Sequence, residues 1–136
     1  MVQMTDSVRE AVQEKLANGI FNCPKELTLS MISGKWKINI LYHLGTDGPY
    51  YFYELQKLLP AASRKEITAK LKELVEDGLV NRKPLKTVPV KVQYSITPLG
   101  KSLMPIIDAM LKWGQQRLDD LQLGQVEFGL GKVKHE

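Results

Sequence analysis

Cysteine and histidine are scarce in this 136-residue sequence, which has one cysteine and two histidines. A single cysteine excludes an internal disulfide framework and agrees with a reducing cytosol. No apolar run approaches the roughly 18 residues that a membrane-spanning helix needs. The N-terminal segment is too polar for a signal peptide. The sequence therefore predicts a cytoplasmic protein without a membrane partner.

Signatures of catalysis and metal binding are missing as well. The two histidines are separate, with His43 inside an expected helix and His135 near the C-terminus. The sequence has no cluster of metal ligands, no glycine-rich phosphate loop and no nucleophile elbow. We interpret His43 as a helix residue that packs or is partly exposed, rather than as a general base. We therefore predict no enzymatic activity, no metal and no cofactor.

Positive charge is present, and it is concentrated in one segment. The whole chain has a formal net charge of +4, and residues Ser63 to Lys91 alone hold eight cations and four anions. A local basic field of this kind attracts a phosphate backbone. A membrane surface could attract it too, but no amphipathic helix with a large apolar face lies beside it. The charge distribution thus favours a nucleic-acid partner.

The basic segment begins with a strongly signalled helix. The letters SRKE from Ser63 to Glu66 have the form of a capping box, in which the side chains of the first and last residue bond to each other's backbone N–H. Gly78 can take the left-handed conformation that ends a helix. Helical spacing predicts one buried stripe, made by Ile67, Leu71, Leu74 and Val75. The outer face is basic and carries hydroxyl groups.

Short elements flank this helix on both sides. A short helix over Tyr53–Leu59 precedes it, separated by Pro60-Ala61-Ala62. Two strands follow over Leu79–Leu85 and Val90–Ile96, and Lys86–Pro89 connects them. The second strand alternates, with Val90, Val92, Tyr94 and Ile96 on one side. The short run Tyr50–Phe52 could add a third strand to this hairpin.

Helix, tight turn, helix and hairpin in this order predict a winged helix-turn-helix over residues 53–97. Exposed cations at the start of the second helix suit insertion into a DNA major groove. The alternative is an ordinary helical hairpin with solvated charges, and the adjoining hairpin of strands favours the DNA interpretation. The predicted DNA-binding residues are Ser63, Arg64, Lys65, Thr68, Lys72, Lys86 and Lys91. Arginine reads guanine better than lysine does, because its fork matches two acceptors.

Terminal helices complete a single expected domain over residues 1–136. We expect a buried central helix over Lys35–Leu44, and Pro105 should interrupt the helix that begins at Thr97-Pro98. Residues 5–20 and 105–122 form helices with narrow apolar stripes. Such stripes more often pack on their own domain, but here we predict a homodimer interface. Its residues are Val8, Val12, Leu16, Ile107, Met110, Leu111, Gly114 and Leu118. The predicted fold class is α+β, mainly α.

The lone cysteine stands at a position where it could sense oxidants. Cys23 directly precedes Pro24, which can open a helix, and a helix N-terminus favours the thiolate and hence reactivity. A dimer would present two copies for an intersubunit disulfide. The alternative is a buried thiol that acts as a small hydrophobic side chain. Cys23 is therefore a candidate redox or electrophile sensor.

With these residues in view, the chain resembles the HxlR-type transcriptional regulators, which are relatives of the MarR group. The resemblance covers roughly Cys23 to Gly114. It rests on Cys23-Pro24, GKWK (34–37), ILYHL (40–44), FYEL (52–55), Leu59-Pro60, the helix 63–74, LVEDGLV (74–80), VPVKVQYSITPLGKSL (88–103) and Trp113-Gly114. Tyr51 stands where the family often has a basic residue, which puts a phosphate contact in doubt. Gln93 replaces a frequent acidic residue.

The resemblance implies a bacterial, dimeric DNA-binding regulator, often a repressor and sometimes an activator. In some relatives, a cysteine at the place of Cys23 is a redox switch. We expect the homodimer to bind a pseudo-palindromic operator in double-stranded DNA and to respond to an electrophile, a redox signal or a small molecule. The alternative is a winged-helix module that binds proteins and has no DNA specificity.

Overall fold

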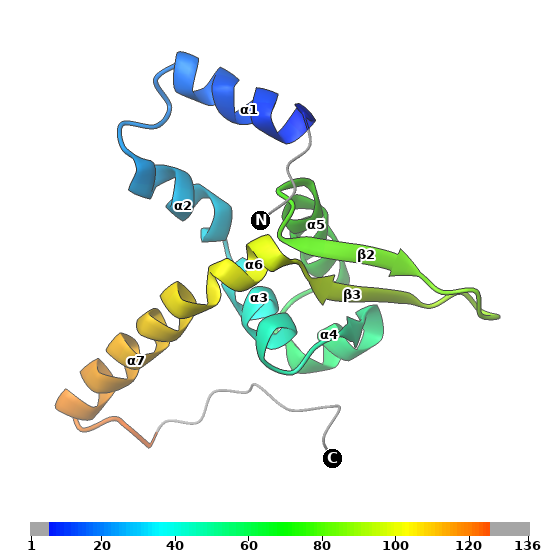
Figure 1. Cartoon of the computed structure of the whole chain (residues 1–136). Helices are drawn as coiled ribbons and strands as arrows, with labels where there is room; N and C mark the ends of the chain where they lie inside the picture. Colours follow the sequence, from blue (N-terminus) through cyan, green and yellow to red (C-terminus); the bar gives the residue numbers. More distant parts are fainter. Residues whose placement is uncertain (1–5, 126–136) are drawn as a thin grey trace.

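A computed structural model describes residues 6–125 of the chain, and its helices lie at the base of a small antiparallel sheet that projects from them (Figure 1). The fold is mainly helical α+β and has the form of a winged helix-turn-helix. Its elements in chain order are α1 (Asp6–Ala17), α2 (Pro24–Ile32), α3 (Lys37–Thr46), β1 (Tyr50–Tyr51), α4 (Phe52–Leu58), α5 (Arg64–Glu76), β2 (Val80–Pro84), β3 (Val92–Ile96), α6 (Pro98–Ser102) and α7 (Met104–Asp120). No helix in the described part is long and apolar enough to cross a membrane.

The hydrophobic core lies between α3, the helix-turn-helix and the sheet. The α5 stripe enters it as predicted, with Ile67, Leu71 and Leu74 buried and Val75 packed partly against them. From the other elements the core receives Ile40, Leu41, Leu44, Leu55, Leu58, Leu59, Leu79 and Val80. Because one stripe of α5 is buried on all these partners, the opposite stripe must face solvent.

The sheet has the order β1-β3-β2, and both pairings are antiparallel. The predicted third strand is confirmed, since Tyr50 of β1 lies opposite Tyr94 of β3. Both tyrosines are buried, so the sheet closes one side of the core. Val80 lies opposite Ile96 at the base of the hairpin. This register holds the hairpin against the start of α4.

Two predicted apolar positions lie elsewhere than expected. Val90 does not belong to β3, which begins at Val92, and its side chain is 66% exposed. The Thr87 hydroxyl donates to the Pro89 carbonyl and accepts from the Lys91 backbone N–H, which closes a loop around Val90. Ile107 is not available to a partner, because it is only 3% exposed and belongs to the core of its own chain. These two positions correct the sequence predictions.

His43 is buried in α3, as a packed residue rather than an accessible base. Its side chain is only 3% exposed, and within the described residues neither ring nitrogen has a hydrogen-bond partner. Burial lowers the pKa of His43 by desolvation, and the charge of Asp47 offsets part of that effect. The imidazole is therefore neutral at neutral pH and serves as a core side chain.

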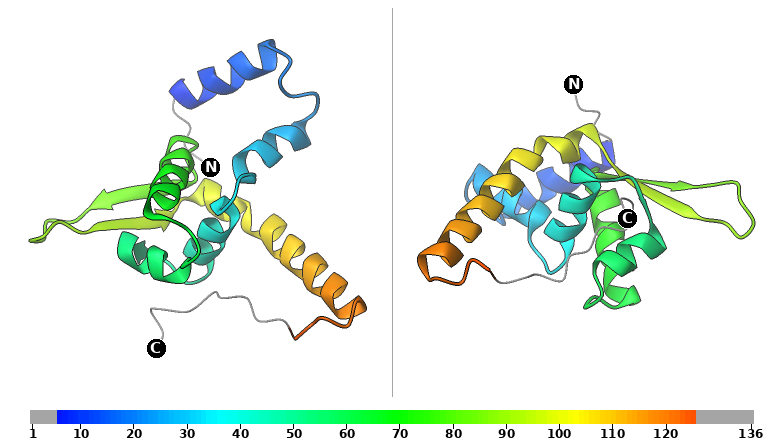
Figure 2. Two further views of the ribbon diagram at one scale, coloured as in Figure 1. Left: turned by 180° about the vertical axis from the view of Figure 1, so that it is seen from behind. Right: turned by 90° about the horizontal axis from the view of Figure 1, so that it is seen from below.

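The terminal helices project away from the wing. Figures 1 and 2 show α7 and the α1–α2 pair extending on the side of the molecule opposite to the β2–β3 hairpin. Leu103 separates α6 from α7 and Pro105 lies in the first turn of α7, so the predicted interruption is confirmed. Helix α1 runs over Asp6–Ala17, and residue 5 of the predicted 5–20 segment lies outside the described residues. Beyond Ile107, no residue of α7 is buried.

Candidate nucleic-acid interface

The start of α5 is held in place by its capping box. The Ser63 hydroxyl accepts from the Glu66 backbone N–H at 3.0 Å, and the Glu66 carboxylate accepts from the Ser63 backbone N–H at 3.0 Å. The predicted box is therefore confirmed. Reciprocal caps satisfy two backbone donors that a helix start leaves open, so they define where the first turn lies. The side chains of that turn consequently project from a fixed end.

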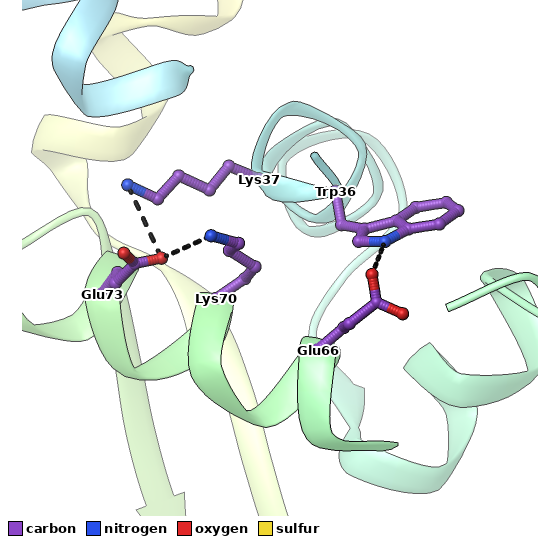
Figure 3. Close-up of polar contacts among 5 residues, drawn as sticks. All are labelled: Trp36, Lys37, Glu66, Lys70 and Glu73. Carbon is purple, nitrogen blue, oxygen red and sulfur yellow. Dashed lines mark hydrogen bonds and ion pairs between the residues drawn. The ribbon is translucent and has the colours of Figure 1, made fainter. Parts of the chain in front are cut away.

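Glu66 also connects the recognition helix to the turn before α3. The Trp36 indole Nε1 donates to Glu66 Oε2 at 2.9 Å (Figure 3). Trp36 has a φ of 81°, a left-handed conformation that is unusual for a bulky residue. The hydrogen bond from the Ser63 backbone, followed by that from Trp36, lowers the pKa of Glu66. Glu66 is thus an anionic acceptor for two different segments.

Further along α5, an ion-pair group joins it to α3. Lys70 Nζ lies 3.2 Å from Glu73 Oε2, and the buried Lys37 of α3 lies 3.9 Å from the same oxygen (Figure 3). Lys37 is 6% exposed, so its charge needs this carboxylate nearby. Lys70 is therefore paired with Glu73 beside α3, whereas Arg64, Lys65 and Lys72 of α5 make no ion pair within the described residues.

All predicted DNA-binding side chains are exposed. Arg64, Lys65, Thr68 and Lys72 lie on the outer face of α5, and Ser63 caps it. Lys86 and Lys91 lie in the loop between β2 and β3. A hollow of about 400 Å³ separates the helix from the wing and is lined by Thr68, Leu71, Lys72, Val75, Glu76, Arg82 and Tyr94. The α5 outer face and the wing therefore lie next to each other.

Aromatic residues outside the predicted DNA-binding set adjoin this face. The Arg64 guanidinium carbon lies 5.2 Å from the centre of the Phe52 ring, which is within the range of a cation–π contact. The rings of Tyr51 and Tyr53 stack with centroids 5.7 Å apart. The run of consecutive aromatic residues at the start of a helix was the sequence signal that could have identified them. In the sequence, these residues predicted only a third strand and the start of a short helix.

Cys23 and the predicted dimer residues lie far along the chain from α5. Cys23 is half-buried at the N-cap of α2, where Glu26 accepts hydrogen bonds from the backbone N–H groups of Cys23 and Asn22.

The predicted dimer residues of α1 differ in exposure: Val8 and Val12 are half-buried, and Leu16 is 55% exposed. On α7, Met110 and Leu111 are about half exposed, and Gly114 and Leu118 are half-buried. Within residues 6–125, no three metal-ligating side chains come together.

Comparison with known proteins agrees with this geometry. A family model described as HxlR-like helix-turn-helix matches residues 31–122. The HTH-type transcriptional regulator YdzF of Bacillus subtilis is 47% identical over 91 residues, which cover 67% of this chain and 84% of YdzF. YdeP of the same organism is 45% identical over 103 residues, covering 74% of this chain and 80% of YdeP.

Solved structures give the same result. The redox regulator HypR in its reduced form has a TM-score of 0.69 and 40% identity, covering 74% of this chain and 98% of HypR. The reduced form of the transcriptional regulator YodB from B. subtilis has a TM-score of 0.60 and 34% identity, covering 71% of this chain and 94% of YodB. The chain is a member of a family of transcriptional regulators, not of enzymes, and it belongs to the HxlR-like helix-turn-helix family.

Proposed function

We propose that this protein is a sequence-specific DNA-binding repressor that inserts α5 into a major groove. The proposal is carried by one observation: α5 buries Ile67, Leu71 and Leu74 and exposes Arg64, Lys65 and Thr68 near its capped start. Helix-turn-helix proteins contact base edges with this part of the second helix. The wing cations Lys86 and Lys91 would meet the flanking backbone or the minor groove.

We further propose that the protein acts in the cytoplasm as a homodimer through α1 and α7. Large apolar side chains remain exposed on these helices, including Leu16, Met110, Leu111 and Trp113. A groove of about 400 Å³ below α1 is lined largely by apolar atoms, from residues such as Val8, Val12, Leu27, Met31 and Leu99. Exposed patches of this kind favour a protein partner. A second copy would place two α5 helices about one turn of DNA apart, on a pseudo-palindrome.

The test of DNA binding uses the full-length protein and the DNA upstream of its own gene. Footprinting should protect a pseudo-palindromic sequence, and a duplex carrying it should bind about 10³-fold or more tightly than a scrambled duplex. Affinity should also fall steeply with salt, because released counterions accompany every neutralised phosphate. The matched control is the scrambled duplex at the same salt concentration. A protein-interaction module would show no sequence preference and no steep salt dependence, and that result would reject our proposal.

We also propose Cys23 as the site of a redox or electrophile signal. HypR, which this chain resembles, is a redox regulator, and YodB is a transcriptional regulator. In this chain, α2 carries Cys23 at its start and leads into the turn where Trp36 bonds to Glu66 at the start of α5. A modification that displaces α2 could therefore alter the position of the recognition helix.

The prediction for Cys23 is a loss of response in its serine variant. Diamide should change the operator affinity of the wild-type protein about tenfold or more, which corresponds to roughly 1.4 kcal/mol. The Cys23→Ser variant should bind the operator with the affinity of the untreated wild type, and diamide should not change that affinity. Affinity is read by fluorescence anisotropy with a labelled operator duplex before and after treatment. A Cys23→Ser protein that responds as the wild type does would exclude a sensing role for this thiol.

A further inference from the structure

Three consecutive aromatic residues at the junction of β1 and α4 gather cations from three elements. Tyr51 and Tyr53 have parallel rings, with an interplanar angle of 8° and centroids 5.7 Å apart. Lys91, from the wing, lies 5.5 Å from the centre of the Tyr51 ring, and Lys57 of α4 lies 5.7 Å from the centre of the Tyr53 ring. We call these four residues the tyrosine–lysine cluster. Phe52 between the tyrosines contacts Arg64 of α5.

The backbone determines that Lys91 reaches this place. Tyr51 lies opposite Gln93 of β3 in the sheet. Lys91 stands two residues before Gln93 in the chain, directly ahead of the first residue of β3. The Lys91 backbone is anchored on both sides, because its N–H donates to the Thr87 hydroxyl at 3.1 Å and its carbonyl accepts from the Leu85 N–H at 2.7 Å. The wing loop thus presents the Lys91 ammonium group to the tyrosine rings.

Charge at the cluster is positive and available. Glu54, the acidic residue of α4, is outnumbered by the two lysines, and its carboxylate accepts from the Tyr51 backbone N–H at 2.8 Å. Lys57 and Lys91 are exposed, and Tyr53 is 45% exposed. Within the described residues, no hydrogen bond engages the Tyr51 or Tyr53 hydroxyl. Two exposed ammonium groups therefore lie beside two tyrosine rings, next to the Phe52 ring that contacts Arg64 of α5.

We propose that the tyrosine–lysine cluster is a binding site for the sugar-phosphate backbone of double-stranded DNA. The inference deepens the proposed function and rests on it. Phosphate oxygens accept from lysine and from tyrosine, and such contacts set the register of a protein on the duplex without reading its sequence. The rings restrict the ammonium groups before binding, which lowers the ordering cost on association. Tyr51 thus supplies an O–H donor beside the Lys91 ammonium group.

The two kinds of residue should give different signatures in salt titrations. Tyr51→Phe and Tyr53→Phe keep the rings and remove the hydroxyl groups, so affinity should fall roughly threefold to tenfold per lost bond. It should fall equally on the operator and on a scrambled duplex, and the slope of log K against log salt should not change. Lys91→Gln and Lys57→Gln should reduce that slope by about 0.9 for each lost contact, hence by about 2 in a dimer.

Lys112→Gln on α7 is the matched control, since it removes the same charge from a helix that projects away from the wing (Figure 2). Its salt slope should equal that of the wild type, and thermal midpoints should show that all variants are folded. Wild-type affinity of the Tyr51→Phe/Tyr53→Phe double variant would overturn the cluster proposal, and so would an unchanged slope in Lys91→Gln. Both outcomes leave sequence-specific binding through α5 standing if the wild type still prefers its operator, but an unchanged slope in Lys91→Gln also removes Lys91 from the proposed wing contacts. A wild-type protein without salt-sensitive DNA binding would instead refute the proposed function itself.

Discussion

Replacing Met110 and Leu111 with glutamate is expected to convert the proposed homodimer into monomers and to reduce operator affinity about 100-fold or more. Both side chains are about half exposed on the described chain, so the change should spare the core of the protomer. In a two-fold dimer, each glutamate would meet apolar surface and the same charge on the other copy. A monomer also loses the second recognition helix, which a dimer supplies at a high effective concentration.

Mass and binding measurements separate the two effects. Light scattering or sedimentation should give a mass near the 15.4 kDa of one chain for the variant and about twice that value for the wild type. Weak binding to a scrambled duplex should persist, since each monomer keeps its basic face. Lys112→Glu provides the control, because it adds a glutamate to the same helix at an exposed polar position. A double variant that remains dimeric would place the interface away from this face of α7.

Removing the Arg64 side chain should chiefly reduce discrimination between DNA sequences. Arg64 occupies the first position of α5, after the Ser63 cap, and its guanidinium lies against the Phe52 ring. The guanidinium group has a planar fork of N–H donors, and from this position it can donate to the two acceptor atoms on the edge of a guanine base. Arg64→Ala should therefore cost about 1–3 kcal/mol of discrimination, or roughly 5- to 150-fold, for each half-site.

A lysine at the same position tests the geometry rather than the charge. Arg64→Lys keeps a cation but has no planar fork, so it should bind scrambled DNA with the wild-type salt slope and still lose operator preference. Anisotropy titrations against the operator and single-base variants of each half-site would locate the base that Arg64 reads. If Arg64→Ala weakens binding to all sequences equally, Arg64 is a phosphate contact and does not read bases.

The helix-turn-helix could be predicted because its signals are local. The Ser63–Glu66 capping box, the stripe from Ile67 to Val75 and the glycine at position 78 each depend on a few neighbouring residues. Helical periodicity and cap chemistry act over one or two turns, so they persist in any tertiary setting. The same reasoning explains why the start of α6 was expected from Pro98 and the break before α7 from Pro105.

Positions that depend on distant partners could not be predicted in this way. The central helix begins at Lys37 rather than Lys35, because Gly34 and Trp36 both adopt positive φ angles and Trp36 bonds to Glu66, 30 residues later. Ile107 fits the apolar seam of α7 as well as Leu111 does, but Ile107 alone is buried. A periodic pattern shows that a residue belongs to an apolar face and leaves open which surface covers it.

By itself, therefore, the sequence determined the recognition helix, its cap, the wing hairpin and the basic charge of that segment. These depend on backbone preferences and on charge, both of which are properties of neighbouring residues. Only the tertiary structure decided that Tyr51, Tyr53, Lys57 and Lys91 form one cluster, and that Arg64 rests on Phe52. The physical reason is that strand register and the docking of α4 on β1 bring together side chains up to 40 positions apart, from Tyr51 to Lys91.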